Sequence, residues 1–214
     1  MKMPFNPRVK LHKLIYLFFV LFCSVSFSQR SQLSNEVQII SEFIASDSFL
    51  SLKENHGELQ AIDSLYLNAV NLTGNNVQEA LLALTFAVVP YKNVPVKFIF
   101  KVKYPLLSAD DSTFKKKNKN LPKYFLPDSP KSEFGDKDKL AHFFGNAFVA
   151  YTSQVFDLTK AIGYFVEVFE ENFTPENQID LRDLKTNKLG EAFGKSLKKD
   201  QTLLPSIFIK KYQQ

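Results

Sequence analysis

The segment from Asp138 to Gly194 decides the fold of this chain. It opens with Asp138-Lys139-Leu140-Ala141-His142-Phe143-Phe144-Gly145-Asn146 and closes with Asp180-Leu181-Arg182-Asp183-Leu184-Lys185-Thr186-Asn187-Lys188-Leu189-Gly190-Glu191-Ala192-Phe193-Gly194. Ionisable and small residues recur there inside apolar runs that have the period of a helix, which predicts three helices. The predicted helices cover Lys139–Phe156, Leu158–Asn172 and Leu181–Lys198.

A polar stripe follows the predicted third helix. At about 100° per residue, Asp183, Asn187 and two glycines fall within an arc of roughly 60°, with Asp180 at its edge. A glycine inside a helix costs about 1 kcal/mol relative to alanine. We therefore expect the glycines to allow another helix to approach closely. The predicted helix-packing glycines are Gly145, Gly163, Gly190 and Gly194.

Polar stripes from the three helices are expected to meet in one cluster. Unpaired buried charges cost several kcal/mol, so each charged member needs a partner. We expect Lys139 or Arg182 to neutralise Glu167, and His142 to donate a hydrogen bond to Asp183. The predicted cluster has a structural or binding role, and its members are Asp138, Lys139, His142, Asn146, Glu167, Asp180, Asp183 and Asn187.

A divalent-metal site is the alternative for the same cluster. His142, Glu167 and Asp183 supply the imidazole and carboxylate ligands that hold zinc and similar ions. Such a site would make the protein a metal-assisted hydrolase acting on envelope material. The sequence contains no phosphate loop, CxxC pair, HExxH or GxSxG motif. We therefore assign no catalytic residue and, in the first interpretation, no cofactor.

The order and spacing of these residues resemble the VanZ-like family and, within it, the small YfiM-type envelope proteins. The matching elements are Asp138-Lys139-x-x-His142-Phe143, then Glu167 after an apolar run, then Asp180-x-x-Asp183-x-x-x-Asn187-x-x-Gly190-x-x-x-Gly194. The resemblance covers the C-terminal part of the chain only. It implies a helical protein associated with the bacterial envelope, with a structural or binding role and no defined reaction.

The N-terminus has the pattern of a secretory signal peptide. Residues 1–13 are basic, Leu14–Phe22 is apolar, and Ser26-Phe27-Ser28 favours cleavage before Gln29. A retained membrane anchor is the alternative, but the apolar run is well short of the roughly 20 residues that span a bilayer. Lipid attachment at Cys23, the single cysteine, is also left open. We expect an exported protein in the periplasm or peripheral to an envelope membrane.

The predicted helices of the C-terminal part are poor membrane spans. Leu158–Phe173 carries one lysine and three glutamates. Each charge near a bilayer centre costs roughly 2.5–3.5 kcal/mol on insertion scales. Only Leu140–Phe156 has a suitable composition, and we expect a soluble or membrane-peripheral bundle.

The net charge of the chain says little about its partners. The formal charge is +5, from 27 basic and 22 acidic residues. Cleavage after Ser28 would remove four basic residues and no acidic one, leaving a net charge of +1. Without interleaved arginine and aromatic residues, we expect no nucleic-acid partner. A membrane surface and an envelope protein stay open as partners, and the oligomeric state is not indicated.

The sequence as a whole predicts a mainly α fold, a small helical bundle with one short strand. The alternation in Val96–Tyr104 favours a strand, with a segment lying on lipid head groups as the alternative. The lysine run Lys115–Lys119 favours a solvated loop, with attraction to anionic lipid as the alternative. The predicted divisions are a signal peptide (1–28), a mostly helical region (29–108), a polar linker (109–137), a VanZ/YfiM-like three-helix unit (138–200) and a tail (201–214).

Overall fold

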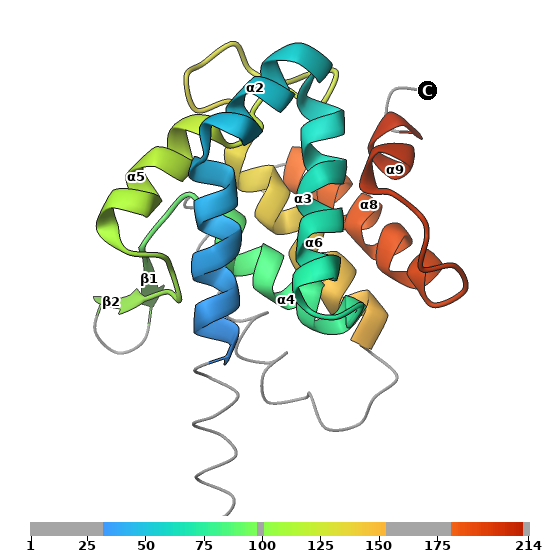
Figure 1. Cartoon of the computed structure of the whole chain (residues 1–214), viewed down its shortest axis with the longest axis horizontal. Coiled ribbons are helices and arrows are strands. Elements are labelled where there is room, and N and C mark those ends of the chain that lie inside the picture. The colour runs from blue at the N-terminus through green and yellow to red at the C-terminus, as the bar shows by residue number, and fades with distance from the viewer. Residues whose placement is uncertain (1–31, 98–100, 153–180, 212–214) are drawn as a thin grey trace, which may run out of the picture.

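A computed structural model describes residues 32–97, 101–152 and 181–211 of the chain. The predicted signal peptide, Cys23 and the predicted second helix of the C-terminal unit lie outside the described residues. What is described is a mainly helical bundle, so the predicted fold class is confirmed (Figure 1). After a helix over 32–45, the elements are α2 (Asp47–His56), α3 (Glu58–Leu72), α4 (Val77–Val88), β1 (Asn93–Lys97), β2 (Lys101–Pro105), α5 (Asp111–Asn120), α6 (Lys137–Thr152), α8 (Leu181–Leu197) and α9 (Pro205–Lys211).

Local signals set the boundaries of the first helices. Ser46 caps α2, because its hydroxyl accepts a hydrogen bond from the backbone N–H of Phe49 at 3.1 Å. Gly57 then separates α2 from α3 with a φ of 89°, a conformation that favours glycine. Asn76 caps α4 by accepting from the backbone of Glu79. Glycine at the break and asparagine at the helix start are residue types favoured at these positions.

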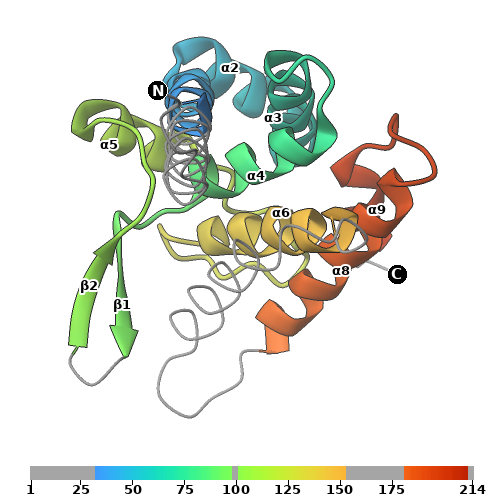
Figure 2. The ribbon, with the colours of Figure 1, turned by 90° about the horizontal axis from the view of Figure 1, so that it is seen from below.

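One hydrophobic core joins segments that the sequence divides. The central α6 contacts α4 on one side and α8 on the other (Figure 2). The ring of Phe193 in α8 lies 5.4 Å from those of Phe143 in α6 and Tyr66 in α3, measured between centroids. It also lies 5.3 Å from the ring of Phe208 in α9. This aromatic group therefore connects four helices from both halves of the chain.

Residues 201–214 are not simply a tail, because they include α9. Pro205, Phe208 and Ile209 are buried. A carboxylate oxygen of Asp63 in α3 accepts from the backbone N–H of Ser206 at 2.8 Å, which satisfies a donor at the start of the helix. The helix has only seven residues, too few for periodicity to predict it.

The extended segment is a hairpin and not the single strand that the sequence predicts. β1 and β2 are antiparallel, with Val96 opposite Val102 and Lys97 opposite Lys101. This register joins the strands through three residues, so positions four apart stay on the same face. The alternations of the two strands are therefore in phase in the sequence and imitate one strand.

The lysine run is not the solvated loop that the sequence favours, because it lies in α5. The side chain of Asp110 starts this helix by accepting from the backbone N–H groups of Ser112 and Thr113 at 2.9 and 3.1 Å. Lys115, Lys116 and Lys119 are exposed on α5. The polar stretch 109–137 thus contains a capped helix packed on the body of the protein.

Lys117 in α5 is completely buried, with an exposed fraction of 0%. Its ammonium donates to the carbonyl oxygens of Ala87 and, at 2.8 Å, Val89. These carbonyls lie at the C-terminal end of α4, where backbone acceptors have no partner within the helix. A buried cation there also interacts favourably with the helix dipole. Lys117 therefore stabilises a helix end, a role that a run of lysines in a sequence does not indicate.

Because Lys117 is buried, we expect the protein to become more stable as the pH rises above neutral. Burial, aided by the charge of Lys92, lowers the pKa of Lys117 to about 7, from 10.5 for an ordinary lysine. Between these values the unfolded chain binds a proton that the folded chain has lost. The free energy of unfolding should therefore rise with pH, by at most about 1.4 kcal/mol per unit from this group. Urea unfolding at several pH values between 7.5 and 9.5 measures the slope.

The Lys117→Met variant is the control for this slope. Burial also lowers the pKa values of Lys53 and Lys137, so these groups contribute with the same sign. The difference in slope between wild type and variant isolates Lys117. If the free energy of unfolding changed with pH equally in wild type and variant, Lys117 would not titrate in this range.

Across residues 32–97, 101–152 and 181–211, no helix combines the length and the apolar character needed to cross a membrane.

Candidate functional site

The site forms where α8 packs along α6. A Cβ atom added to Gly190 would lie 2.9 Å from the carbonyl carbon of Phe143, and closer still to its oxygen. A Cβ atom added to Gly194 would meet the carbonyl group of Ala147 in the same way. These glycines let α8 touch the backbone of α6, so the polar residues one and two turns before them are pressed against α6. Gly145 is buried within α6, and Gly163 lies outside the described residues.

A buried ion pair is the centre of the site. The ammonium of Lys139 contacts a carboxylate oxygen of Asp183 and lies 3.2 Å from one of Asp138. Lys139 has an exposed fraction of 4% and Asp183 one of 7%. Charges removed from water to this degree require close partners. One lysine thus links the start of α6 to the first turn of α8.

Two amides and an imidazole extend this network along the helix interface. Asn146 donates to the side-chain oxygen of Asn187 at 2.9 Å, and to the backbone oxygen of His142 at 2.9 Å. The same oxygen of Asn187 lies 3.1 Å from Nδ1 of His142. Because this oxygen accepts from Asn146, it must also accept from the ring, which assigns the proton of a neutral imidazole to Nδ1.

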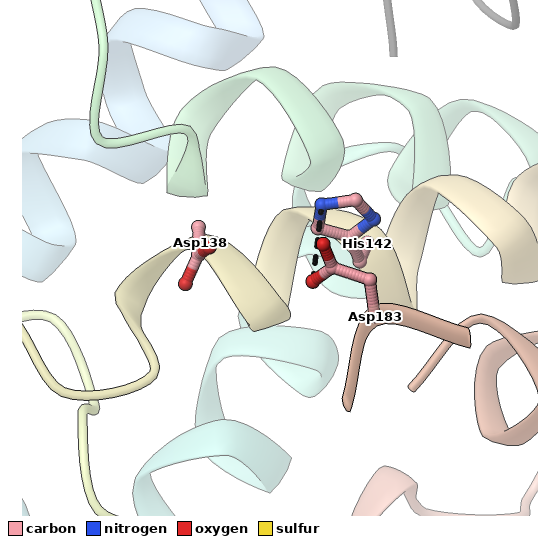
Figure 3. Close-up of side chains that lie close together, drawn as sticks. All are labelled: Asp138, His142 and Asp183. Atoms are coloured by element: carbon pink, nitrogen blue, oxygen red, sulfur yellow. Dashed lines mark ion pairs between the residues drawn. The ribbon is translucent and has the colours of Figure 1, made fainter. Parts of the chain in front are cut away.

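His142 is held as a neutral side chain. Burial lowers the pKa of His142, although the charges of Asp183 and Asp138 oppose this shift. The lowered pKa leaves the imidazole uncharged at pH 7. Its Nε2 faces the carboxylate of Asp183 at 3.6 Å, too far for a hydrogen bond (Figure 3).

Six of the eight residues predicted for the cluster lie together in the structure. They come from two helices, and α6 supplies four of them. Glu167 and Asp180 lie outside the described residues, so their membership stays a prediction. The six residues are Asp138, Lys139, His142, Asn146, Asp183 and Asn187.

The pairing within the cluster differs from the expectation. His142 does not donate to Asp183, because its Nδ1 proton is directed to the amide of Asn187. Arg182 pairs with Asp136 and Asp128, and the expected neutralisation of Glu167 stays a prediction, because Glu167 lies outside the described residues. Helix periodicity places residues on a face, but it does not specify which of two nearby acceptors a side chain uses.

Sequence reasoning missed a second ion pair beside the cluster. Arg182 donates to Asp136 at 2.5 Å and lies 3.3 Å from Asp128. Asp136 is completely buried and also accepts from the hydroxyl of Ser129. These acidic residues belong to the irregular stretch before α6, where no periodicity marks them. The ion pair of Arg182 with these aspartates connects the stretch before α6 to the start of α8.

Sequence reasoning also missed two aromatic residues near the cluster. The rings of Tyr91 and Phe134 stack with centroids 6.0 Å apart, and both side chains are partly exposed. Burial, followed by the charge of Asp138, raises the pKa of Tyr91 to about 12. Tyr91 therefore lies within the electrostatic range of the cluster.

The donor atoms of the cluster fit a metal ion in part. One ligand atom from each of Asp138, His142 and Asp183 lies within 4.8 Å of the others (Figure 3). With its proton on Nδ1, His142 has a lone pair on Nε2, as a metal ligand requires. However, the ammonium of Lys139 contacts both carboxylates. An ion could bind between them only if that ammonium moved away.

Comparisons of the chain with models of protein families, with curated proteins and with solved structures find no match.

Proposed function

We propose that the protein is an exported helical protein of the bacterial envelope, in which the α6–α8 cluster has a structural or binding role and performs no reaction. The buried lysine between two aspartates supports this role. Lys139 already supplies the positive charge that Asp138 and Asp183 require. Its low exposure also leaves little room for a substrate to reach these groups.

The pattern of residues 1–28 supports export, and the spacing of the cluster supports the kinship with VanZ-like and YfiM-type proteins. Both parts of the proposal rest on the sequence. In this proposal the network of Lys139, Asp183 and the two asparagines fixes one arrangement of α6 against α8. A buried polar network can specify a unique packing even where it adds little net stability.

Cell fractionation tests the proposed location. The protein should lack residues 1–28, and it should be recovered either in the periplasmic fraction or in a membrane fraction from which alkaline carbonate releases it. Mass spectrometry of the intact protein measures the processing. A chain that keeps residues 1–28 and stays in the cytoplasm would contradict the proposal, whereas release by detergent alone would indicate an integral protein.

A metal-assisted hydrolase acting on envelope material is the second candidate. The observation that favours it is the closeness of Asp138, His142 and Asp183. Asp138 takes the third position in this set, and Glu167, a ligand expected from the sequence, lies outside the described residues. A stoichiometric divalent ion in the purified protein, lost in the His142→Ala variant, would establish this candidate.

A further inference from the structure

A carboxylate lies at a core-facing position in the helix over 32–45. Glu36 precedes Ile40 by one turn and Ile44 by two, and both isoleucines are completely buried. Glu36 itself has an exposed fraction of 5%. One of its carboxylate oxygens, Oε2, is buried and has no hydrogen-bond partner in the described part of the chain. Glutamate is rarely buried in this way unless a positive charge accompanies it.

A second carboxylate meets Glu36 from the first turn of α4. The side-chain nitrogen of Gln32 donates to Oε1 of Glu36 at 3.0 Å and to Oε1 of Glu79 at 2.5 Å. One nitrogen atom therefore lies between the two carboxyl groups. The other oxygen of Glu79 accepts from the side chain of Asn76 at 3.2 Å. Two acidic side chains from different helices thus converge on a single neutral donor.

No basic side chain balances these two charges. In the part of the chain that the structure describes, neither Glu36 nor Glu79 forms an ion pair with a lysine or an arginine. Burial raises the pKa of Glu36, the hydrogen bond from Gln32 opposes this shift, and the charge of Glu79 adds to it. A buried polar atom without a partner requires an explanation in a native protein, and a bound ion is one of the usual ones.

We propose that Glu36, Glu79 and the side-chain oxygen of Gln32 form a binding site for a divalent cation, with calcium as the best fit. Calcium binds carboxylate and amide oxygens, and water completes its coordination shell. The cation takes the place of the amide nitrogen between the carboxylates, and a half-turn of the amide presents its oxygen instead. The set holds neither an imidazole nor a thiolate, so it favours calcium over zinc.

This site lies outside the α6–α8 cluster, so it can exist whether or not the proposed function holds. The helix over 32–45 and α4 supply all of its ligands. Bound calcium cancels the repulsion between the two carboxylates and gives the buried oxygen of Glu36 a partner. It therefore joins the start of one helix to the start of the other.

Thermal unfolding in the presence of calcium tests this site with the form of the protein that accumulates in cells. The purified protein is first freed of divalent ions by a chelator. Calcium chloride is then added up to about 10 mM, which exceeds the dissociation constants of about 0.1–1 mM of weak oxygen sites. The melting temperature of wild type should rise, because an ion that binds only the folded state stabilises it. Sodium chloride of equal ionic strength should not reproduce the rise.

The Glu36→Gln variant should lose the calcium-dependent rise. Without calcium it should melt no lower than wild type, because the change removes one of two like charges and the new amide can donate to Glu79. This second measurement separates loss of the site from a failure to fold. The Glu79→Gln variant should lose the rise as well. Glu54→Gln is the matched control, since Glu54 is exposed on α2, and it should keep the full response.

Three results would overturn this proposal. Absence of a calcium-dependent rise in wild type would exclude the site. If the melting temperature then rose as the pH fell from about 7 to about 5, and did not rise in Glu36→Gln, the two carboxyl groups would share a proton in place of a cation. Loss of the calcium response in Asp183→Asn, with the response intact in Glu36→Gln, would assign the ion to the α6–α8 cluster. A response that both glutamate variants retain would assign it to other carboxylates.

Discussion

Replacement of Lys139 by methionine should lower the free energy of unfolding by about 3–5 kcal/mol, the usual effect of removing one partner from a buried ion pair. Methionine has nearly the length of lysine, so the loss of stability is due mainly to the removed positive charge and only slightly to the change in side-chain volume. It leaves two carboxylates without their cation in a site where Asp183 is almost completely buried. Urea unfolding of wild type and variant measures the difference.

Lys188→Met is a matched control for this change. Lys188 lies on the exposed side of α8, and an exposed substitution of this kind should change stability by less than about 0.5 kcal/mol. The double variant K139M/D183N should lose less than the sum of the two single losses, because removal of the second charge relieves the first. Additive losses would show that Lys139 and Asp183 do not act as a pair.

The same proteins distinguish the structural role from a metal site. Zinc should not raise the melting temperature of wild type, because Lys139 contacts the carboxylates that would bind the ion. A ligand that binds only the folded state stabilises it by about 2.7 kcal/mol at 100 times its dissociation constant. A zinc-dependent rise that His142→Ala abolishes would therefore support the hydrolase candidate.

Helical periodicity is sufficient to place the residues of this site. Asp183 and Asn187 are one turn apart in α8, and His142 and Asn146 are one turn apart in α6. Residues one turn apart lie on the same side of a helix, and the glycines indicate which side faces the other helix. Together these two signals place the four side chains at the interface. Periodicity does not determine hydrogen-bond partners: Nδ1 of His142 lies 3.1 Å from Asn187, and Nε2 of the same ring lies 3.6 Å from Asp183. This is why the expected pair of His142 with Asp183 is replaced by the pair with Asn187.

Features that depend on distant contacts could not be predicted. The role of Lys117 is set by two carbonyl oxygens roughly 30 positions earlier in the chain. The start of α9 is fixed by Asp63, 143 positions before its partner Ser206. In the sequence, the segments that form α5 and α9 show only a polar run and a short apolar run, which do not indicate these contacts. The reversal of the hairpin was hidden because it preserves the alternation of the two strands.

Replacement of Gly190 or Gly194 by alanine should lower the free energy of unfolding, although alanine is the better helix former. Each new methyl group would meet a backbone carbonyl of α6, which cannot turn aside as a side chain can. Overpacking of this kind costs about 1–3 kcal/mol and sometimes more, against a helix-propensity gain of about 1 kcal/mol. We expect a net loss of about 1–2 kcal/mol for each variant, since a rigid backbone contact belongs to the upper part of the overpacking range.

The sign of this change is the decisive result. If α6 and α8 were not in close contact, propensity alone would make both variants more stable than wild type. The Ala192→Gly variant measures the effect of helix propensity alone, because Ala192 is exposed in the same helix. This variant should lower the free energy of unfolding by about 1 kcal/mol. The double variant G190A/G194A should lose less than the sum of its parts, because one separation of the helices relieves both contacts.

The same separation should change the environment of His142. The lowered pKa of His142 is due first to burial between the two helices. Moving α8 away from α6 admits water and lengthens the hydrogen bond to Asn187. The pKa of His142 should therefore rise toward that of an ordinary histidine in Gly190→Ala, as an NMR titration of the ring would show. An unchanged pKa in a destabilised variant would mean that the glycine contacts support the fold without setting the geometry of the polar cluster.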